Sequence, residues 1–182
     1  AQTGKVRYEV DLTRPHTQVV SMRMRLEGIT SPHVEVHLPV WRPGLYLILD
    51  QAGGVQKLSA VAAGSEDKLS VSKINKSSWR IETAGQSSIE VIYDVWAASL
   101  ENRTRHIDDS HAFLSPSAVF LYAHEWRNLP IDIDLNLPPA WRVASGMDAV
   151  PGGDRPGSIL TAANYDVLAD SPIEAGVHDR LT

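Results

Sequence analysis

The chain has no cysteine among its 182 residues. This absence excludes a disulfide framework, a thiolate nucleophile and any zinc site built on cysteine. Basic residues are outnumbered as well, because 17 Lys and Arg stand against 22 Asp and Glu, giving a formal net charge of -5. Non-specific nucleic-acid binding needs a basic face, so we expect no nucleic-acid partner. The longest apolar runs are far too short to cross a bilayer, so we expect no membrane partner either.

A long amphipathic helical pattern is also missing, and the dominant signal is an alternation of apolar and polar residues with a period of two. Such alternation predicts strands with one buried face. At most one or two helical turns are expected, around residues 97–103. Many short strands separated by turns rich in Gly and Pro favour an all-β antiparallel sandwich with little helix. The expected strands are residues 20–26, 34–38, 89–95 and 131–137, with shorter ones at 6–10, 69–71, 79–81 and 119–122.

The alternation fades at about residue 164, which predicts a boundary in the chain. We expect a β-sandwich N-terminal domain over residues 1–163 and a connector over residues 164–182 that leads toward a further domain. The stop at Thr182 without a finishing element suggests a fragment. The small, polar residues 1–4 are consistent with a mature end left by signal cleavage or with an arbitrary boundary.

Seven histidines make a metal site the first chemistry to consider. His124 is followed by a glutamate, like the start of the HExxH motif of zinc peptidases, but Asn128 stands where the second histidine is needed. His33 and His37 lie on an expected strand, which separates them by roughly 13 Å, too far for one ion. The densest group of metal-capable side chains is residues 106–111, HIDDSH. We interpret it as a solvated acidic loop, with a bound cation as the alternative, and assign no metal ligand in this chain.

No pattern in the sequence assigns a catalytic residue. The nucleophile elbow G-x-S-x-G is absent. Asp132 and Asp134 are paired carboxylates, but they lie on the polar face of an expected strand, where solvated charge is the usual explanation. A hydrolase whose triad assembles only in space is left open. The five tryptophans are interpreted as core anchors, and the alternative is an exposed platform for sugar binding.

Five segments, taken together and in order, resemble the glycyl aminopeptidase family of bacterial zinc metallopeptidases. The likeness extends over nearly the whole chain. The segments are residues 37–46 (HLPVWRPGLY), 71–79 (VSKINKSSW), 89–95 (IEVIYDV), 137–145 (LPPAWRVAS) and 165–176 (YDVLADSPIEAG).

The resemblance implies an all-β N-terminal domain that precedes a thermolysin-like catalytic domain, with a PDZ domain after it. The implied activity of the parent is zinc-dependent removal of N-terminal residues, with glycine or alanine preferred. The zinc motif of that family has no counterpart here, so we expect no cofactor in this chain, zinc in the parent, and no activity in the chain alone.

We therefore expect a non-catalytic domain that packs against the catalytic domain of the same polypeptide, shapes its cleft and meets peptide substrate indirectly. A periplasmic or secreted location goes with this expectation. The alternative is a stand-alone β-sandwich module that binds carbohydrate or protein through tryptophans or a sheet edge. The first hypothesis predicts an apolar patch near the C-terminal segment, and the second predicts aligned, exposed tryptophan rings.

One candidate substrate contact is Glu174, in the segment 170–174 at the exit toward the missing domain. A carboxylate there could pair with the free amine of a peptide. The alternative is that the segment caps the domain junction, with Pro172 fixing the direction of the chain.

Overall fold

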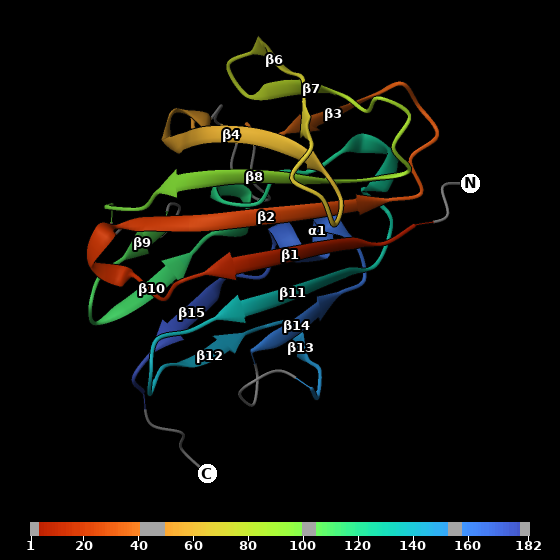
Figure 1. Ribbon diagram of the computed structural model, residues 1–182. Helices are drawn as coiled ribbons and strands as arrows, with labels where there is room; N and C mark the ends of the chain where they lie inside the picture. Colours follow the sequence, from red (N-terminus) through yellow and green to blue (C-terminus); the bar gives the residue numbers. More distant parts are fainter. Residues whose placement is uncertain (1–3, 41–49, 100–104, 153–157, 179–182) are drawn as a thin grey trace.

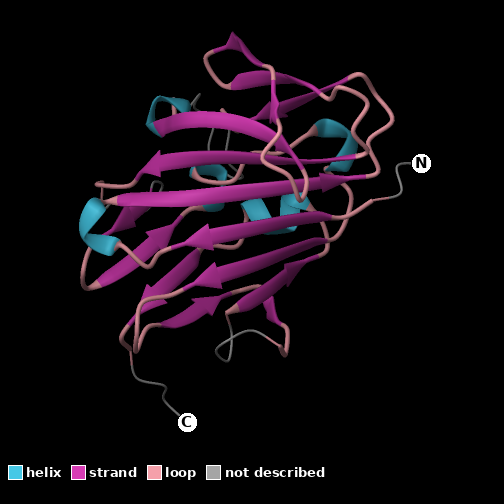
Figure 2. Cartoon of the chain, viewed as in Figure 1, coloured by secondary structure: helices cyan, strands magenta, loops and turns pink. Residues whose placement is uncertain are grey.

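The structure is a computed structural model of the chain, and it describes residues 4–40, 50–99, 105–152 and 158–178. Strands dominate these ranges, as Figure 2 shows. Helical structure within them consists of the short helix α1 (Tyr165–Ala169) and the 3-10 turns η1 (Pro15–Thr17), η2 (Ala52–Gly54), η3 (Pro116–Ala118) and η4 (His124–Trp126). The strands are β1 (Val6–Asp11), β2 (Val19–Glu27), β3 (His33–His37), β4 (Val55–Ala62), β5 (Lys68–Leu69), β6 (Val71–Asn75), β7 (Ser78–Glu82), β8 (Ser88–Trp96), β9 (Arg105–Ile107), β10 (His111–Leu114), β11 (Ile131–Asn136), β12 (Arg142–Ser145), β13 (Asp148–Ala149), β14 (Ile159–Ala162) and β15 (Ile173–Gly176).

These strands form three sheets. The largest has eight strands in the order β13-β14-β11-β1-β2-β8-β4-β5, the second has four in the order β12-β15-β10-β9, and the third has three in the order β3-β7-β6. Figure 1 shows the four-stranded sheet and α1 behind the eight-stranded sheet. The described strand pairs are antiparallel except β1 and β11, which run parallel from Val6 opposite Ile131 to Asp11 opposite Asn136. The expected all-β sandwich with little helix is confirmed.

The alternation seen in the sequence produces the two faces of the large sheet. Buried and partly buried residues alternate along the whole of β2, with Val20, Met22, Met24 and Leu26 at most 2% exposed. These side chains belong to a single hydrophobic core cluster that also contains buried residues of the four-stranded sheet. Burial of aliphatic side chains on this scale contributes about 1.5–3 kcal/mol for each, so the inner face provides much of the driving force for folding.

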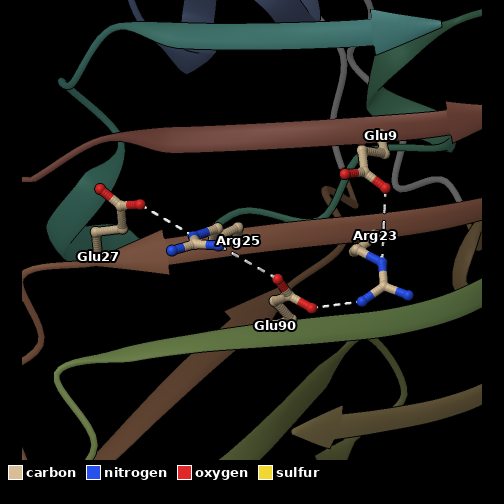
Figure 3. A network of polar contacts seen from close by, with 5 residues as sticks. All are labelled: Glu9, Arg23, Arg25, Glu27 and Glu90. Carbon is tan, nitrogen blue, oxygen red and sulfur yellow. Dashed lines mark hydrogen bonds and ion pairs between the residues drawn. The ribbon is translucent and has the colours of Figure 1, made fainter. Parts of the chain in front are cut away.

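The outer face of the large sheet carries a network of charged side chains (Figure 3). Arg23 on β2 contacts Glu90 on β8, and its Nε lies 3.6 Å from Oε2 of Glu9 on β1. Arg25 lies 3.6 Å from Glu90 and 3.0 Å from Glu27. Strand register explains the pairs, because Glu9 lies opposite Arg23 and Glu90 lies opposite Arg25. The network covers three strands with polar atoms, as expected of a face turned to solvent.

A shallow hollow of about 200 Å³ lies on this outer face, with Glu9, Ser21 and Asn136 among its lining residues. Small-molecule sites usually enclose about 300–1,000 Å³ and are mostly apolar. The hollow is smaller and lined largely by polar side chains, so it does not indicate a ligand pocket.

Residues 119–122 do not form the expected strand. They pass through the core after η3, and their one ladder contact is an isolated bridge between Tyr122 and His37. Val119, Phe120 and Leu121 are completely buried. A buried backbone without a sheet partner must find other hydrogen-bond partners, because unpaired buried polar groups are costly.

Tyrosine hydroxyls provide those partners, and we refer to residues 119–121 as the tyrosine-capped segment. The hydroxyls come from β1, β8 and α1, so the segment ties together three parts of the chain that are distant in sequence. Leu121 N also donates to Tyr93 Oη at 3.1 Å. The hydroxyl donations are Tyr8 Oη to Leu121 O (2.6 Å), Tyr93 Oη to Val119 O (3.0 Å) and Tyr165 Oη to Phe120 O (2.7 Å).

The chain from residue 165 to 176 is part of the same packed domain. Helix α1 begins after Asn164, whose side chain caps it by accepting from Val167 N at 3.0 Å, and Leu168 is completely buried. Strand β15 then pairs with both β12 and β10. The fading alternation at residue 164 therefore does not mark the end of the packed structure. The sequence predicts neither α1 nor β15, because both are too short to show a period.

The expected helical turn near residues 97–103 is not seen in its described part. Ala98 instead makes an isolated antiparallel bridge with His106, and residues 100–104 lie outside the described residues. Within the described ranges, no helix has the length and apolar character needed to cross a membrane.

Candidate functional site

The four-stranded sheet has one face buried in the core. Every second residue along β9, β10 and β15 is buried and forms the inner face of this sheet. These residues are Arg105, Ile107, Ala112, Leu114, Ile173 and Ala175. Alternation then places the intervening residues on the outer face. Those residues are His106, His111, Phe113 and Glu174. This outer face is the candidate functional site.

Glu174, the substrate contact expected from the sequence, lies on this outer face. It is exposed, and it stands opposite Phe113 on β10 and Ala144 on β12. In the next position across the sheet, Phe113 stands opposite His106 on β9. Neighbouring strands are about 4.8 Å apart, so Glu174 is roughly 10 Å from the backbone of His106. The role of Glu174 stays a prediction.

The turn between β9 and β10 is organised by the carboxylate of Asp108. Its Oδ1 accepts from Ser110 N at 2.8 Å, from Ser110 Oγ at 2.6 Å and from His111 N at 3.1 Å. Its Oδ2 lies 3.1 Å from His106 Nε2. The hydrogen bonds from Ser110, with further help from His106 and His111, hold the pKa of Asp108 well below its usual range. Asp108 is therefore a fixed anion at neutral pH.

His106 is the buried member of this group. The residue is only 8% exposed, and neither ring nitrogen has an aligned hydrogen-bond partner. The contact between Nε2 and Asp108 thus lies off the axis along which an imidazole N–H would donate. The rings of His106 and His111 are 5.1 Å apart between centroids. One potential ligand atom from each of His106, Asp108 and His111 lies within 4.8 Å of the others.

Ser110, His111 and Asp108 do not form a catalytic triad, although all three are adjacent. His111 Nδ1 contacts Ser110 Oγ at 2.8 Å and also lies 3.7 Å from Asp108 Oδ1. A triad needs the serine and the carboxylate on opposite nitrogens of the ring, so that one holds the base while the other is activated. Here both contacts fall on the same nitrogen. The arrangement can hold a cation, but it cannot relay a proton from serine.

The residues around His124 do not fit the zinc motif of peptidases. His124 opens the 3-10 turn η4, and the chain leaves this turn at Arg127 without a helix that could align a second ligand. Asn128 occupies the position of the missing histidine. His33 and His37 lie at the two ends of β3, as expected from the alternation.

The structure brings His37 and His124 together, a pair that the sequence does not indicate. Their ring centroids are 4.8 Å apart, and His37 Nδ1 lies 2.8 Å from Ser78 Oγ. The bridge between His37 and Tyr122 causes this proximity, because it places η4 beside the end of β3. Burial, and then the neighbouring His124, lowers the pKa of His37.

Arg105 connects three core elements on the inner side of β9. Its Nε donates to Trp96 O at 2.8 Å, and its Nη1 donates to Gln51 Oε1 at 2.7 Å and to Ala118 O at 3.0 Å. Burial lowers the pKa of Arg105. A Cβ on Gly54 would lie 1.7 Å from its Nη2, so the glycine makes room for the guanidinium.

Tryptophans in the described residues do not form an exposed platform. Trp79, Trp126 and Trp141 are at most 6% exposed, and Trp96 is 48% exposed. Trp126 Nε1 donates to Glu27 O at 2.8 Å, as a core tryptophan does. Trp41 lies outside the described residues. Large exposed apolar side chains near the C-terminal segment include Val167 and Val177.

Solved structures with the same fold come from aminopeptidase-type proteins. An aminopeptidase N family protein from Idiomarina loihiensis matches with a TM-score of 0.85 and 28% identity, over 94% of this chain and 29% of that chain. An M1 zinc metallopeptidase from Deinococcus radiodurans matches with a TM-score of 0.55 and 8% identity, over 94% of this chain and 41% of that chain. The chain thus spans less than half the length of either protein. A comparison with curated protein sequences finds no match.

These structures define the class, a β-sheet domain that forms one part of larger aminopeptidase-like proteins. The family model of the Peptidase M61 N-terminal domain matches residues 7–177. The chain belongs to this family. The match includes α1 and β15, in agreement with their place in the core.

Proposed function

We propose that this chain is the non-catalytic N-terminal domain of a zinc-dependent aminopeptidase, and that it packs against a catalytic domain of the same polypeptide and shapes its cleft. The observation that carries the proposal is the family match over residues 7–177 of a chain that spans 29% of its structural relative. In this proposal the zinc, the glycyl or alanyl preference, the thermolysin-like domain and the PDZ domain all belong to the parent protein. A periplasmic or secreted location of the parent is part of the proposal, and cell fractionation tests it.

The site geometry of this chain supports a non-catalytic role. His124 lacks the partner of a zinc motif, and the group formed by Asp108, Ser110 and His111 has the wrong arrangement for a triad. The chain therefore contributes shape and surface to the proposed enzyme.

The experiment compares the 182-residue chain with the full-length natural protein on alanyl and glycyl amides, with and without a zinc chelator. We expect activity in the full-length protein alone and its loss when chelator is added. Chelator-sensitive hydrolysis by the 182-residue chain would refute the non-catalytic assignment. A full-length protein without aminopeptidase activity would refute the parent activity.

We further propose that Glu174 pairs with the free amine of peptide substrates in the full-length enzyme. Exposed ion pairs contribute about 0.2–1 kcal/mol, so Glu174→Ala should raise KM by about 1.4- to fivefold and leave kcat unchanged. The control is Glu66→Ala, which removes another exposed carboxylate, from the turn between β4 and β5. Unchanged KM in Glu174→Ala removes the proposed contact and leaves the domain assignment untouched.

A further inference from the structure

We propose that His106, Asp108 and His111 bind a divalent transition-metal cation of the zinc type, at a site separate from any catalytic zinc of the parent protein. The three residues come from the β9–β10 hairpin, and one potential ligand atom from each lies within 4.8 Å of the others. The proposal does not depend on the peptidase assignment, because it concerns only side chains of this chain.

Strand pairing brings the two histidines onto one face. Phe113 stands opposite His106, and His111 is two residues before Phe113 on the same strand, so the histidines are diagonal neighbours on the outer face. Ligand atoms around tetrahedral zinc lie about 3.4 Å apart when the bonds are about 2.1 Å. A set of ligand atoms at most 4.8 Å apart would have to draw together by up to roughly 1.4 Å to reach this spacing. The side chain of His111 is 31% exposed and lies at the rim of the site.

His106 provides the strongest indication of a ligand. More than nine-tenths of the residue is buried, yet neither ring nitrogen has an aligned hydrogen-bond partner among protein atoms. Leaving such a group unpaired in the interior is costly. The carboxylate of Asp108 lies 3.1 Å from Nε2 but off the N–H axis. Two ligands of one cation have this relation, because each directs a lone pair at the ion and not at the other ligand.

The turn leaves one carboxylate oxygen of Asp108 available for the cation. Oδ1 already accepts three hydrogen bonds, from Ser110 N, Ser110 Oγ and His111 N. These bonds fix the side chain and direct Oδ2 toward His106. The carboxylate is thus held in place before a metal arrives, which reduces the entropic cost of binding.

Ser110 selects the tautomer of His111. Its hydroxyl hydrogen is committed to Asp108 Oδ1, which can only accept. At the 2.8 Å contact with His111 Nδ1, Ser110 Oγ must then accept from the ring. His111 therefore carries its proton on Nδ1 and offers the lone pair of Nε2. Support of a ligating histidine through its second nitrogen is the usual arrangement in metal sites.

The donor set determines the class of cation. Two imidazole nitrogens and one carboxylate oxygen suit Zn²⁺, Co²⁺, Ni²⁺ or Cu²⁺, whereas Ca²⁺ and Mg²⁺ prefer oxygen ligands. Three protein ligands leave a fourth position for water or for a group of another domain. Binding would join β9 to the start of β10 beside the face that carries Glu174.

The test is calorimetric titration of Zn²⁺ into the chelator-treated 182-residue chain, with Co²⁺ absorption as a second readout. We expect one high-affinity equivalent with a Kd of about 10 µM or tighter, and no displacement by excess Ca²⁺. The variants are Asp108→Asn and His111→Gln, which preserve size at partly exposed positions and so leave the fold intact. Matched controls are His16→Ala and His33→Ala, histidines outside the cluster.

Loss of a direct ligand should weaken Zn²⁺ binding roughly tenfold or more, because loss of an outer partner alone already costs about that much. The controls should bind within about twofold of the unmodified chain. Zn²⁺ should also raise the Tm of the unmodified chain but not that of Asp108→Asn. The proposal would be overturned by absence of binding at about 0.1 mM Zn²⁺, or by displacement of bound Zn²⁺ by Ca²⁺. It would also be overturned if Asp108→Asn and His111→Gln bound Zn²⁺ as tightly as the unmodified chain.

Discussion

The tyrosine-capped segment allows a sharp test of what holds the core together. In Tyr93→Phe the ring is retained, but the hydroxyl that donates to Val119 O and accepts from Leu121 N is lost. Two buried backbone groups are then left unpaired, each at about 1–3 kcal/mol. We expect the free energy of unfolding to fall by about 3 kcal/mol and the Tm by roughly 6–12 °C.

The measurement is urea unfolding followed by circular dichroism, with the m-value checked for constancy. Tyr8→Phe and Tyr165→Phe each leave one carbonyl unpaired and should lose about 1–2 kcal/mol. Tyr122→Phe is the control, because its hydroxyl makes no hydrogen bond within the part of the chain that the structure describes. A Tyr93→Phe variant within about 0.5 kcal/mol of the unmodified chain, or a Tyr122→Phe variant that loses as much, would refute the reasoning.

Three further predictions follow from charge and close packing. Burial raises the pKa of the three capping tyrosines above the ordinary 10.0, so the unfolded state loses these protons first and the free energy of unfolding should fall as pH rises above that value. Tyrosinate absorbance should then rise together with the loss of circular dichroism. Ionisation of all three tyrosines before unfolding would contradict this prediction. Because the pKa of His37 is lowered in the folded state, neutral His37 contributes to the free energy of unfolding above the ordinary value of 6.5, and this contribution is lost as pH falls through the folded pKa. In urea unfolding, His37→Gln should therefore lose less stability than the unmodified chain between neutral and mildly acidic pH. The same pH dependence in both proteins would count against this role. Gly54→Ala should lower the free energy of unfolding by about 1–3 kcal/mol, because the added Cβ displaces Arg105. The control is Gly53→Ala, whose Cβ meets nothing within 4 Å and which should be close to neutral. Equal Tm values for the two variants would show that the guanidinium can move freely.

Regular alternation explains why the long strands could be predicted from the sequence. In β2 and β11 every second residue is buried along most of the strand, so one local period reports the whole element. Strand β4 cannot be predicted in this way, because Lys57 has a positive φ of 52° and the register with β8 shifts between Gln56 and Ser59. The period is broken at that point, so no alternation can be recognised.

The candidate functional site could be predicted from the sequence only in part. The segment from 106 to 111 could be recognised as metal-capable from composition, but the burial of His106 could not, because it depends on tertiary neighbours. The same holds for His37 and His124, which are brought together by a bridge between distant segments. The sequence predicts a strand at residues 119–122, but in the structure tyrosine hydroxyls from three remote elements take the place of a sheet partner.

The parallel pairing of β1 with β11 has a consequence for synthesis of the chain. Strands β1, β2, β8, β4 and β5 are all complete by Trp96 and can assemble as one sheet, with β1 at its edge. The partner of that edge, β11, is made about 120 residues after β1, which corresponds to roughly 6–24 s at a synthesis rate of about 5–20 residues per second. During this interval the nascent sheet presents an unpaired strand edge, the type of surface on which chains aggregate. The half-made domain should therefore depend on chaperones, and slower translation before residue 131 should reduce the yield of folded protein.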